Sequence, residues 1–338
     1  MTSMERVMAV LQGSPVDRRA FTLLLSLYGA KLTGCNVHEY YTIPDNYLQG
    51  QIAVAEKCKT DILFTPFALS LEAQAFGSEV TYMEKNPPVI RKQFVRNLNE
   101  VDHIMDPDSL RSPSIGYLLD SSRMMVDHFG KTIPVCGILT SPMDLPFIIM
   151  GVENWLELLL FQKETAEKIL SKMADHFVSV ANSMFDAGIA FIGIPMMFSN
   201  PEFVFEKMIV EYIVPALSKI FRQVKGPLVF HHGSMRISRY LQYYTSLPNV
   251  AGFLIDHRDD FSSAREIVGK DTLLLGNLDA PRLGRMPTMV VLDRTRKILD
   301  TIKSDHHVIF ATSAADVAWD TPLETITGIY ELMEQSDG

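Results

Sequence analysis

The feature that most constrains the fold is an alternation of eight short apolar segments with longer helical ones. Helix-length stretches such as 155–188 and 201–226 have apolar residues at three- and four-residue spacing. Strands that are apolar on both faces and alternate with helices predict a parallel sheet. Eight such units predict a (β/α)8 TIM barrel; an open doubly wound sheet is the rival, although no GxGxxG follows the first strand. The expected strands are 20–26, 61–67, 134–141, 190–197, 227–232, 252–257, 272–279 and 307–313.

The whole chain, 1–338, is expected to form a single barrel domain with two additions. The N-terminal residues are expected to form a short helix. They do not resemble a signal peptide, because charged residues stand where its apolar centre would be. The segment 68–133 is long for one crossover, so we expect an insertion there, with a hairpin in 77–95. For the last helix, Asp320 is the expected N-cap.

Composition narrows the functional classes. With 47% hydrophobic and 21% charged residues, the 338-residue chain can form a sizeable core without disulfides. A net charge of −9 disfavours a nucleic-acid binder. The apolar run 139–152 is interrupted by two prolines and Asp144 and is too short to span a membrane. Cys35, Cys58 and Cys136 form no CxxC pair, which favours a reducing, cytoplasmic location.

Candidate functional residues follow from the barrel geometry, since active sites of such barrels lie at the C-terminal ends of the strands. The expected catalytic residues are His231, His232 and Asp256. The expected substrate- or cofactor-binding residues are Glu72, Met196, Met197, Asn277, Asp279 and Ser313. The expected metal ligands are His232, Glu72 and Asp316.

Each of these residues also has a purely structural interpretation. Alternation along a strand sends one of His231 and His232 into the barrel and the other toward the helices. A carboxylate at a strand end, such as Asp256, can cap the next helix or bind loop amides. Glu72 can be an exposed loop residue, and Met196 can be plain packing. The sequence leaves these alternatives open.

Several segments in order along the chain resemble the uroporphyrinogen decarboxylase superfamily. They are ERVMAVLQGSPVDR near the N-terminus, TSPMDLPFIIMG, GFLIDH followed by GNLDAPRLG, and the closing DTPLETI. GNLDAP, at its distance from the LID strand, is the most specific of them. The resemblance runs almost end to end, and it implies a (β/α)8 barrel.

The resemblance implies one of two activities. Decarboxylases of this family bind an acidic tetrapyrrole through arginines of an RQAGR motif, whereas the matching stretch AFTLLLSLYGAKLTG has only Lys31. LEAQAFGSEV is more similar to the methyltransferase branch, which uses a corrinoid carried on a partner protein. We therefore expect a corrinoid-dependent methyltransferase that acts on a small methylated ether or amine, with a homodimer left open. The alternatives are a porphyrinogen decarboxylase and a non-catalytic tetrapyrrole- or corrinoid-binding protein.

The zinc site of that branch is altered in this sequence. Its usual ligands are an HxCG motif after the fifth strand and a cysteine after the eighth. Here His232 stands at the first cysteine position and Ala315 at the second. Two hypotheses follow: a zinc site built from His232, Glu72 and Asp316, or no metal and a histidine that protonates the leaving group.

Overall fold

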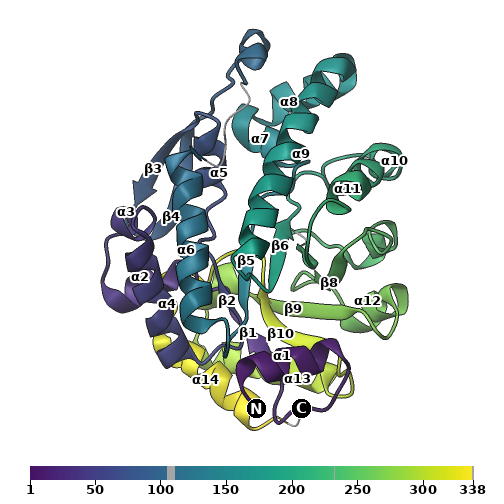
Figure 1. Cartoon of the computed structure of the whole chain (residues 1–338). Coiled ribbons are helices and arrows are strands. Elements are labelled where there is room, and N and C mark those ends of the chain that lie inside the picture. The colour runs from purple at the N-terminus through teal and green to yellow at the C-terminus, as the bar shows by residue number, and fades with distance from the viewer. Residues whose placement is uncertain (105–110, 232, 337–338) are drawn as a thin grey trace.

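The structure, a computed structural model, describes residues 1–104, 111–231 and 233–336. Eight parallel strands form a nearly closed barrel in the order β1-β10-β9-β8-β7-β6-β5-β2 (Figure 1). The predicted TIM barrel is therefore confirmed. The strands are β1 (Phe21–Thr22), β2 (Leu63–Phe64), β5 (Val135–Ile138), β6 (Phe191–Pro195), β7 (Leu228–His231), β8 (Val250–Leu254), β9 (Leu273–Asp279) and β10 (Val308–Ser313).

Every barrel strand overlaps a predicted segment, but β1 and β2 are much shorter than expected. The side-chain hydroxyl of Thr312 accepts the backbone N–H of Leu24 at 2.8 Å, and that of Thr60 accepts the N–H of Leu23 at 3.4 Å. Because side chains take these donors, strand pairing of β1 stops after Thr22. On the β2 side, a backbone bond runs from the Asp61 N–H to the Phe21 carbonyl, 2.9 Å.

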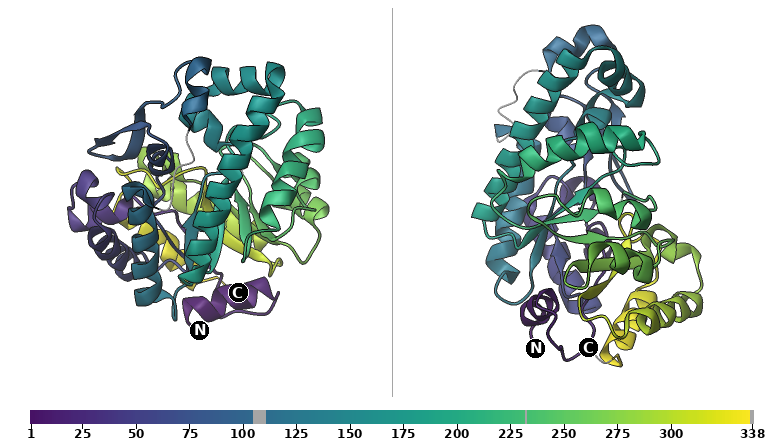
Figure 2. Two further views of the ribbon diagram at one scale, coloured as in Figure 1. Left: turned by 45° about the horizontal axis from the view of Figure 1, so that its top comes forward. Right: turned by 90° about the vertical axis from the view of Figure 1, so that its right-hand side faces the viewer.

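Helices surround the strands (Figures 1 and 2). They are α1 (Ser3–Leu11), α2 (Tyr28–Thr33), α3 (Val37–Tyr40), α4 (Pro44–Cys58), α5 (Ser70–Ala75), α6 (Pro113–Phe129), α7 (Leu145–Met150), α8 (Val152–Phe161), α9 (Lys163–Asp186), α10 (Glu206–Met208), α11 (Val214–Phe221), α12 (Phe261–Val268), α13 (Thr288–Ile302) and α14 (Leu323–Glu334). The described helices include none that is long and apolar enough to cross a membrane.

Three details of the helix prediction were wrong. The expected helix 155–188 is divided into α8 and α9 at Gln162, whose φ of −134° is not helical. The expected helix 201–226 begins only at Glu206 and contains a π-helical turn, Ile209–Ile213. Asp320 is not the N-cap of α14: Pro322 holds that position, and Asp320 is largely exposed.

The segment 68–133 contains the predicted hairpin. Strands β3 (Glu79–Met83) and β4 (Asn86–Lys92) pair antiparallel, apart from the barrel sheet. They lie between α5 and the 3₁₀ helix η1 (Leu98–His103), which α6 follows. The turn of this hairpin, with Lys85 and Asn86, reaches the loops that follow β9 and β10.

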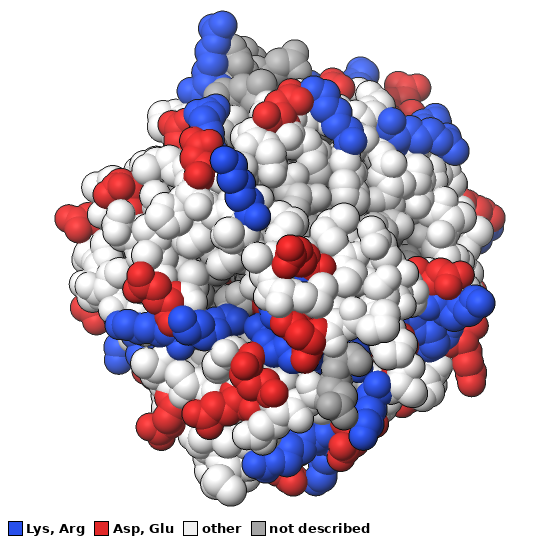
Figure 3. Space-filling model, turned by 60° about the horizontal axis from the view of Figure 1, so that its bottom comes forward, with Lys and Arg blue, Asp and Glu red and all other residues white. Residues whose placement is uncertain are grey.

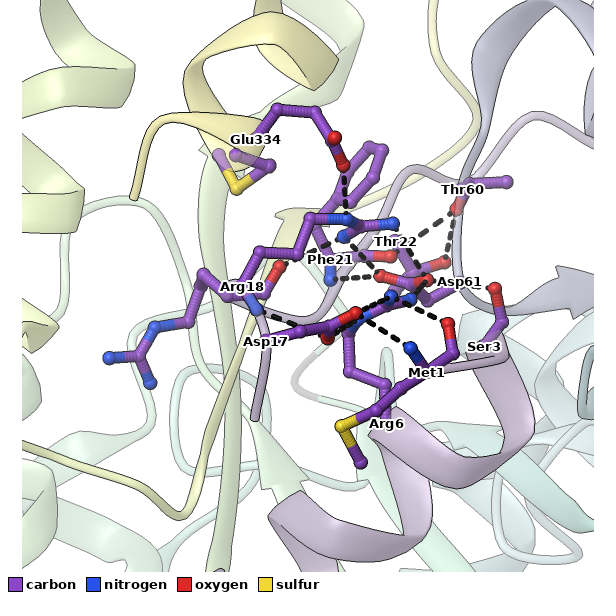
Figure 4. A network of polar contacts seen from close by, with 12 residues as sticks. Met1, Ser3, Arg6, Asp17, Arg18, Phe21, Thr22, Thr60, Asp61 and Glu334 are labelled. Carbon is purple, nitrogen blue, oxygen red and sulfur yellow. Dashed lines mark hydrogen bonds and ion pairs between the residues drawn. The ribbon is translucent and has the colours of Figure 1, made fainter. Parts of the chain in front are cut away.

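A buried ion network closes the N-terminal end of the barrel (Figure 4). The Asp61 carboxylate, fully buried, accepts hydrogen bonds from Arg6 at 2.6 Å and from Arg18 at 2.8 and 3.0 Å. It also accepts the Ser3 hydroxyl and the Phe21 N–H. On the surface of this end, charges of both signs are interspersed (Figure 3). The network thus connects α1, β1 and the start of β2. It lies where the barrel sheet is open, between its two end strands β1 and β2.

Candidate active site at the barrel mouth

A cavity of about 40 Å³ lies inside the barrel. Its described lining includes the last residues of seven barrel strands, among them Pro195, His231 and Ser313, so it reaches the C-terminal mouth. Most of its wall is apolar. The apolar side chains include Leu24, Phe64, Phe67, Ile138, Val229, Leu254 and Leu275.

His231 is among the residues that line this cavity. Its Nδ1 accepts the Gly233 N–H at 3.0 Å. Burial lowers the pKa of His231 to about 4, and the nearby Asp256 carboxylate opposes part of that shift. The ring is therefore neutral at pH 7, and its proton is on Nε2 because Nδ1 is an acceptor. His232, the other predicted residue, lies outside the described residues.

Ser313 is a buried hydroxyl on the same wall. Within residues 1–104, 111–231 and 233–336 its Oγ has no hydrogen-bond partner. The neighbouring hydroxyls are engaged: Thr312 accepts from Leu24, and Thr22 donates to the Ile62 carbonyl at 3.1 Å. An unsatisfied buried hydroxyl costs about 1–3 kcal/mol, and the predicted binding role of Ser313 stays a prediction.

Three predicted residues, Asp256, Asn277 and Asp279, come together at the ends of β8 and β9. Asn277 Nδ2 donates to the Asp256 carbonyl at 3.1 Å. The ring of His257 lies between the two carboxylates, 3.4 Å from Asp256 Oδ1 and 3.4 Å from Asp279 Oδ2. Arg258 Nε donates to Asp256 Oδ1 at 2.5 Å. The sequence reasoning missed Arg258 and did not select His257, although the strand-end rule already pointed to that stretch.

Glu72 is buried on α5, not exposed in a loop. Its Oε1 accepts both the backbone N–H and the hydroxyl of Thr140, at 2.7 and 2.6 Å. Its Oε2 is 3.3 Å from Nε2 of His176, a buried residue of α9 that sequence reasoning missed. Glu72 therefore fixes the loop after β5.

Asp144 performs a similar task for the loop after β6. Its carboxylate accepts the backbone N–H groups of Met197, of Phe198 at 3.1 Å and of Ser199 at 2.9 Å. Burial raises the pKa of Asp144 to about 6, although these hydrogen bonds act in the opposite direction. Met196 is fully buried in the larger of the two clusters of hydrophobic core residues. Neither Met196 nor Met197 is among the described residues that line the inner cavity, so their predicted binding role stays a prediction.

Asp316 belongs to a different cavity from Ser313. Its Oδ1 accepts the Leu27 N–H at 3.2 Å, and burial raises the pKa of Asp316 to about 8. It lines an open cavity of about 520 Å³ between the loop after β10, the 3₁₀ helix η5 (Ala280–Arg285) and the hairpin turn at Lys85. The structure thus separates Asp316 from the wall that carries His231.

The described residues do not fit a zinc ion. In the ranges 1–104, 111–231 and 233–336 no three His, Cys, Asp or Glu side chains could hold a metal. Glu72 is bound to Thr140 and His176, and Asp316 to the Leu27 amide. A zinc site that uses His232 stays a prediction. Cys58 and Cys136 are buried, and burial raises the pKa of Cys58 to about 12.

The comparison with known families fits this barrel. The sequence model of the uroporphyrinogen decarboxylase (URO-D) family matches residues 2–335. The chain belongs to this family. The resemblance seen in the sequence is therefore confirmed, and the URO-D match covers nearly the whole barrel.

Relatives in this family are methyltransferases. The chain is 24% identical over 312 residues to the methylcobamide:CoM methyltransferase MtbA of Methanosarcina acetivorans, covering 88% of this chain and 89% of that one. It is 21% identical over 282 residues to MtaA of Methanosarcina barkeri, covering 82% of each. It is 24% identical to the methylated-thiol–coenzyme M methyltransferase of Methanosarcina mazei, covering 96% of this chain and 87% of that one.

Solved structures have the same fold. A methyltransferase from Methanosarcina mazei superposes with a TM-score of 0.87 at 18% identity, covering 99% of each chain. A B12-independent methionine synthase from Shewanella gives a TM-score of 0.53 at 12% identity, covering 88% of this chain and 89% of that one. At these identities the superpositions establish the fold.

Proposed function

We propose that this URO-D family member is a corrinoid-dependent methyltransferase that moves a methyl group between a small methylated substrate and a corrinoid protein. The observation that carries the proposal is the end-to-end similarity to methylcobamide methyltransferases, 88% of this chain for the first of them. The barrel mouth supplies the place, since active sites of TIM barrels lie at that end. We also propose a cytoplasmic location, because all three cysteines are free.

We assign the enzyme to the substrate side of the transfer. The relatives act with coenzyme M, a thiol, but both cysteine positions of the thiol-activating zinc site are changed in this chain, to His232 and Ala315. A chain without that thiolate site is better suited to remove a methyl group from a donor. The corrinoid, on its own protein, supplies the cobalt nucleophile that takes the methyl group.

The residues of the inner cavity then have definable tasks. Its apolar wall excludes water and holds the methyl group. When the bond between the methyl carbon and the heteroatom breaks, the electron pair stays on the heteroatom. The neutral His231 can donate a hydrogen bond from its Nε2–H to that atom, and solvent supplies the proton that neutralises it. The nearby Asp256 carboxylate favours a positive charge on His231, against the effect of burial.

The inner cavity argues against the decarboxylase alternative. A space of about 40 Å³ is far below the 300–1,000 Å³ of an ordinary ligand pocket, let alone one for a tetrapyrrole. Among the described residues that line it there is no arginine or lysine to pair with substrate carboxylates.

The test is methyl transfer followed by the visible spectrum of the corrinoid. The purified chain is mixed with the corrinoid protein reduced to cobalt(I) and with single methylated donors. We expect the cobalt(I) bands to disappear at a rate proportional to enzyme concentration, and His231→Gln to slow this at least tenfold. Carbon dioxide release from a porphyrinogen, without transfer from any donor, would show that the decarboxylase alternative is right.

A further inference from the structure

Few polar atoms line the inner cavity, and most of them already form hydrogen bonds within the protein. Thr22 donates to the Ile62 carbonyl, and Thr312 accepts the Leu24 N–H. The Cys136 thiol donates to the Gly137 carbonyl at 3.3 Å. The remaining polar side chains on the wall are Ser313, whose hydroxyl has no partner within the described residues, and His231. A ligand polar atom therefore has one defined place, beside Ser313.

The size of the cavity limits the ligand. A water molecule needs about 10–15 Å³ of such space, so about 40 Å³ admits about three non-hydrogen atoms. The limit comes from tight packing of barrel strands. Gly193 lines the cavity, and a methyl group added there would lie 3.0 Å from Ile138 Cδ1 and 3.7 Å from Cys136 Sγ.

The charge of the wall limits the ligand further. No aspartate or glutamate is among the described residues that line the cavity, and the carboxylates at the ends of β8 and β9 have basic partners. Asp256 binds Arg258, and Asp279, the register partner of Ser313, lies 3.3 Å from Arg282 Nε. A cation in this apolar space would lose its hydration without gaining an opposite charge.

We propose that the inner cavity is the donor subsite and that it takes a neutral methyl ether or alcohol of about three non-hydrogen atoms. The ligand oxygen accepts the Ser313 hydroxyl, and the methyl group lies against Val229 and Leu254. Ammonium donors are rejected by charge and larger ethers by size. Transfer of the methyl group to a corrinoid rests on the proposed function, whereas binding of the ether in the cavity does not.

The test measures binding with ligand-observed NMR, which needs no turnover. The probes are dimethyl ether, dimethylammonium, which has the same shape but is charged at pH 7, and diethyl ether, which is longer on each side. We expect binding of dimethyl ether at least tenfold tighter than binding of either other probe. Equal binding of dimethylammonium would overturn the charge argument, and equal binding of diethyl ether would overturn the size argument.

Three variants locate the subsite. Ser313→Ala is expected to weaken dimethyl ether binding about tenfold, the effect of one lost hydrogen bond. Gly193→Ala should abolish it by filling the space. Val229→Ala should let diethyl ether bind, a gain that a misfolded protein would not show. Ser183→Ala, on α9, is the matched control, because its hydroxyl donates to the Ser179 carbonyl of the same helix.

The outcomes separate the two proposals. Suppose that dimethyl ether binds in this pattern but is never demethylated in the presence of the corrinoid protein. That result would support the subsite and refute the proposed function. Demethylation of ammonium or longer donors, unaffected by Ser313→Ala and Gly193→Ala, would uphold the methyltransferase and refute the subsite.

Discussion

The two ends of the barrel treat their buried polar groups in opposite ways. At the N-terminal end, the Asp61 carboxylate is surrounded by donors from Arg6, Arg18, Ser3 and the Phe21 amide. At the C-terminal mouth, the Ser313 hydroxyl has no hydrogen-bond partner among residues 1–104, 111–231 and 233–336. The buried Asp61 carboxylate is thus fully bonded within the chain, whereas the described residues offer the Ser313 hydroxyl no partner.

The difference indicates how the fold divides its tasks. In TIM barrels the N-terminal end serves stability and the C-terminal end serves chemistry. The mouth carboxylates are consistent with this, because Glu72 and Asp144 hold loops through backbone amides and do not face the inner cavity. The loops are thus fixed around a cavity on whose wall the Ser313 hydroxyl has no hydrogen-bond partner among the described residues.

The largest expected effect is at the N-terminal end. Asp61→Ala leaves Arg6 and Arg18 buried without their shared carboxylate, and we expect a loss of about 3–5 kcal/mol in the free energy of unfolding. Urea denaturation measures it. As a control, Asp186→Ala removes an exposed ion pair with Lys225 and should cost less than about 1 kcal/mol. Similar losses in both variants would contradict a special role for the buried network.

The second effect is a pH dependence of opposite sign at the two ends. The pKa of Asp144 is raised from 3.8 to about 6, so its contribution to stability is fully present below pH 3.8 and is lost as the pH rises through about 6. Asp17, hydrogen-bonded to Arg6, has its pKa held well below its usual range, so its contribution is present above pH 3.8 and is lost on acidification.

Asp144→Asn isolates the effect at the mouth, because the amide does not titrate. Between pH 4 and 6 we expect the unfolding free energy of wild type to fall relative to that of Asp144→Asn by on the order of 1 kcal/mol per pH unit. Denaturation at half-unit pH steps measures the difference. A constant difference between the two proteins would show that Asp144 is ionised throughout this range.

A smaller effect is expected where Glu72 holds the loop after β5. Glu72→Ala removes two hydrogen bonds to Thr140 and leaves the buried His176 facing a void, so we expect a loss of about 2 kcal/mol. Glu72→Gln keeps an acceptor and should lose less. If the two variants were equally stable, the bonds to Thr140 would not matter for the fold.

The smallest effect on stability is expected at Ser313. Since its hydroxyl has no partner in the described structure, Ser313→Ala should change the free energy of unfolding by less than about 0.5 kcal/mol or raise it slightly. Thr312→Val is the contrasting variant, because it removes the acceptor of the Leu24 N–H and should destabilise the barrel by about 1–3 kcal/mol. A loss at Ser313 as large as that at Thr312 would mean that Ser313 serves the fold.

The sequence predicted the barrel well because strand length, apolar runs and intervening helices repeat eight times. It also located His231, Asp256, Asn277 and Ser313, since the C-terminal ends of parallel strands meet at one edge. It could not assign Glu72 correctly, because its partner His176 is 104 positions away on α9, and no local pattern links them.

Short-range structure was harder to predict where side chains replace backbone partners. The hydroxyls of Thr60 and Thr312 end the pairing of β1 early. The break between α8 and α9 at Gln162 has no Gly or Pro to mark it in the sequence. Whether a cavity residue is bonded or open also depends on neighbours from other strands, so the contrast between Thr312 and Ser313 required the structure.

The most direct test is the rate of methyl transfer per folded molecule, from a neutral methyl donor to the cobalt(I) corrinoid protein, in one variant from each end. Asp17→Asn, at the N-terminal end, should transfer at the wild-type rate, whereas Ser313→Ala should be at least tenfold slower at limiting donor although it is as stable as wild type. A full rate in Ser313→Ala, or an equal loss in Asp17→Asn, would contradict the division between an end that holds the fold and a mouth that performs the reaction.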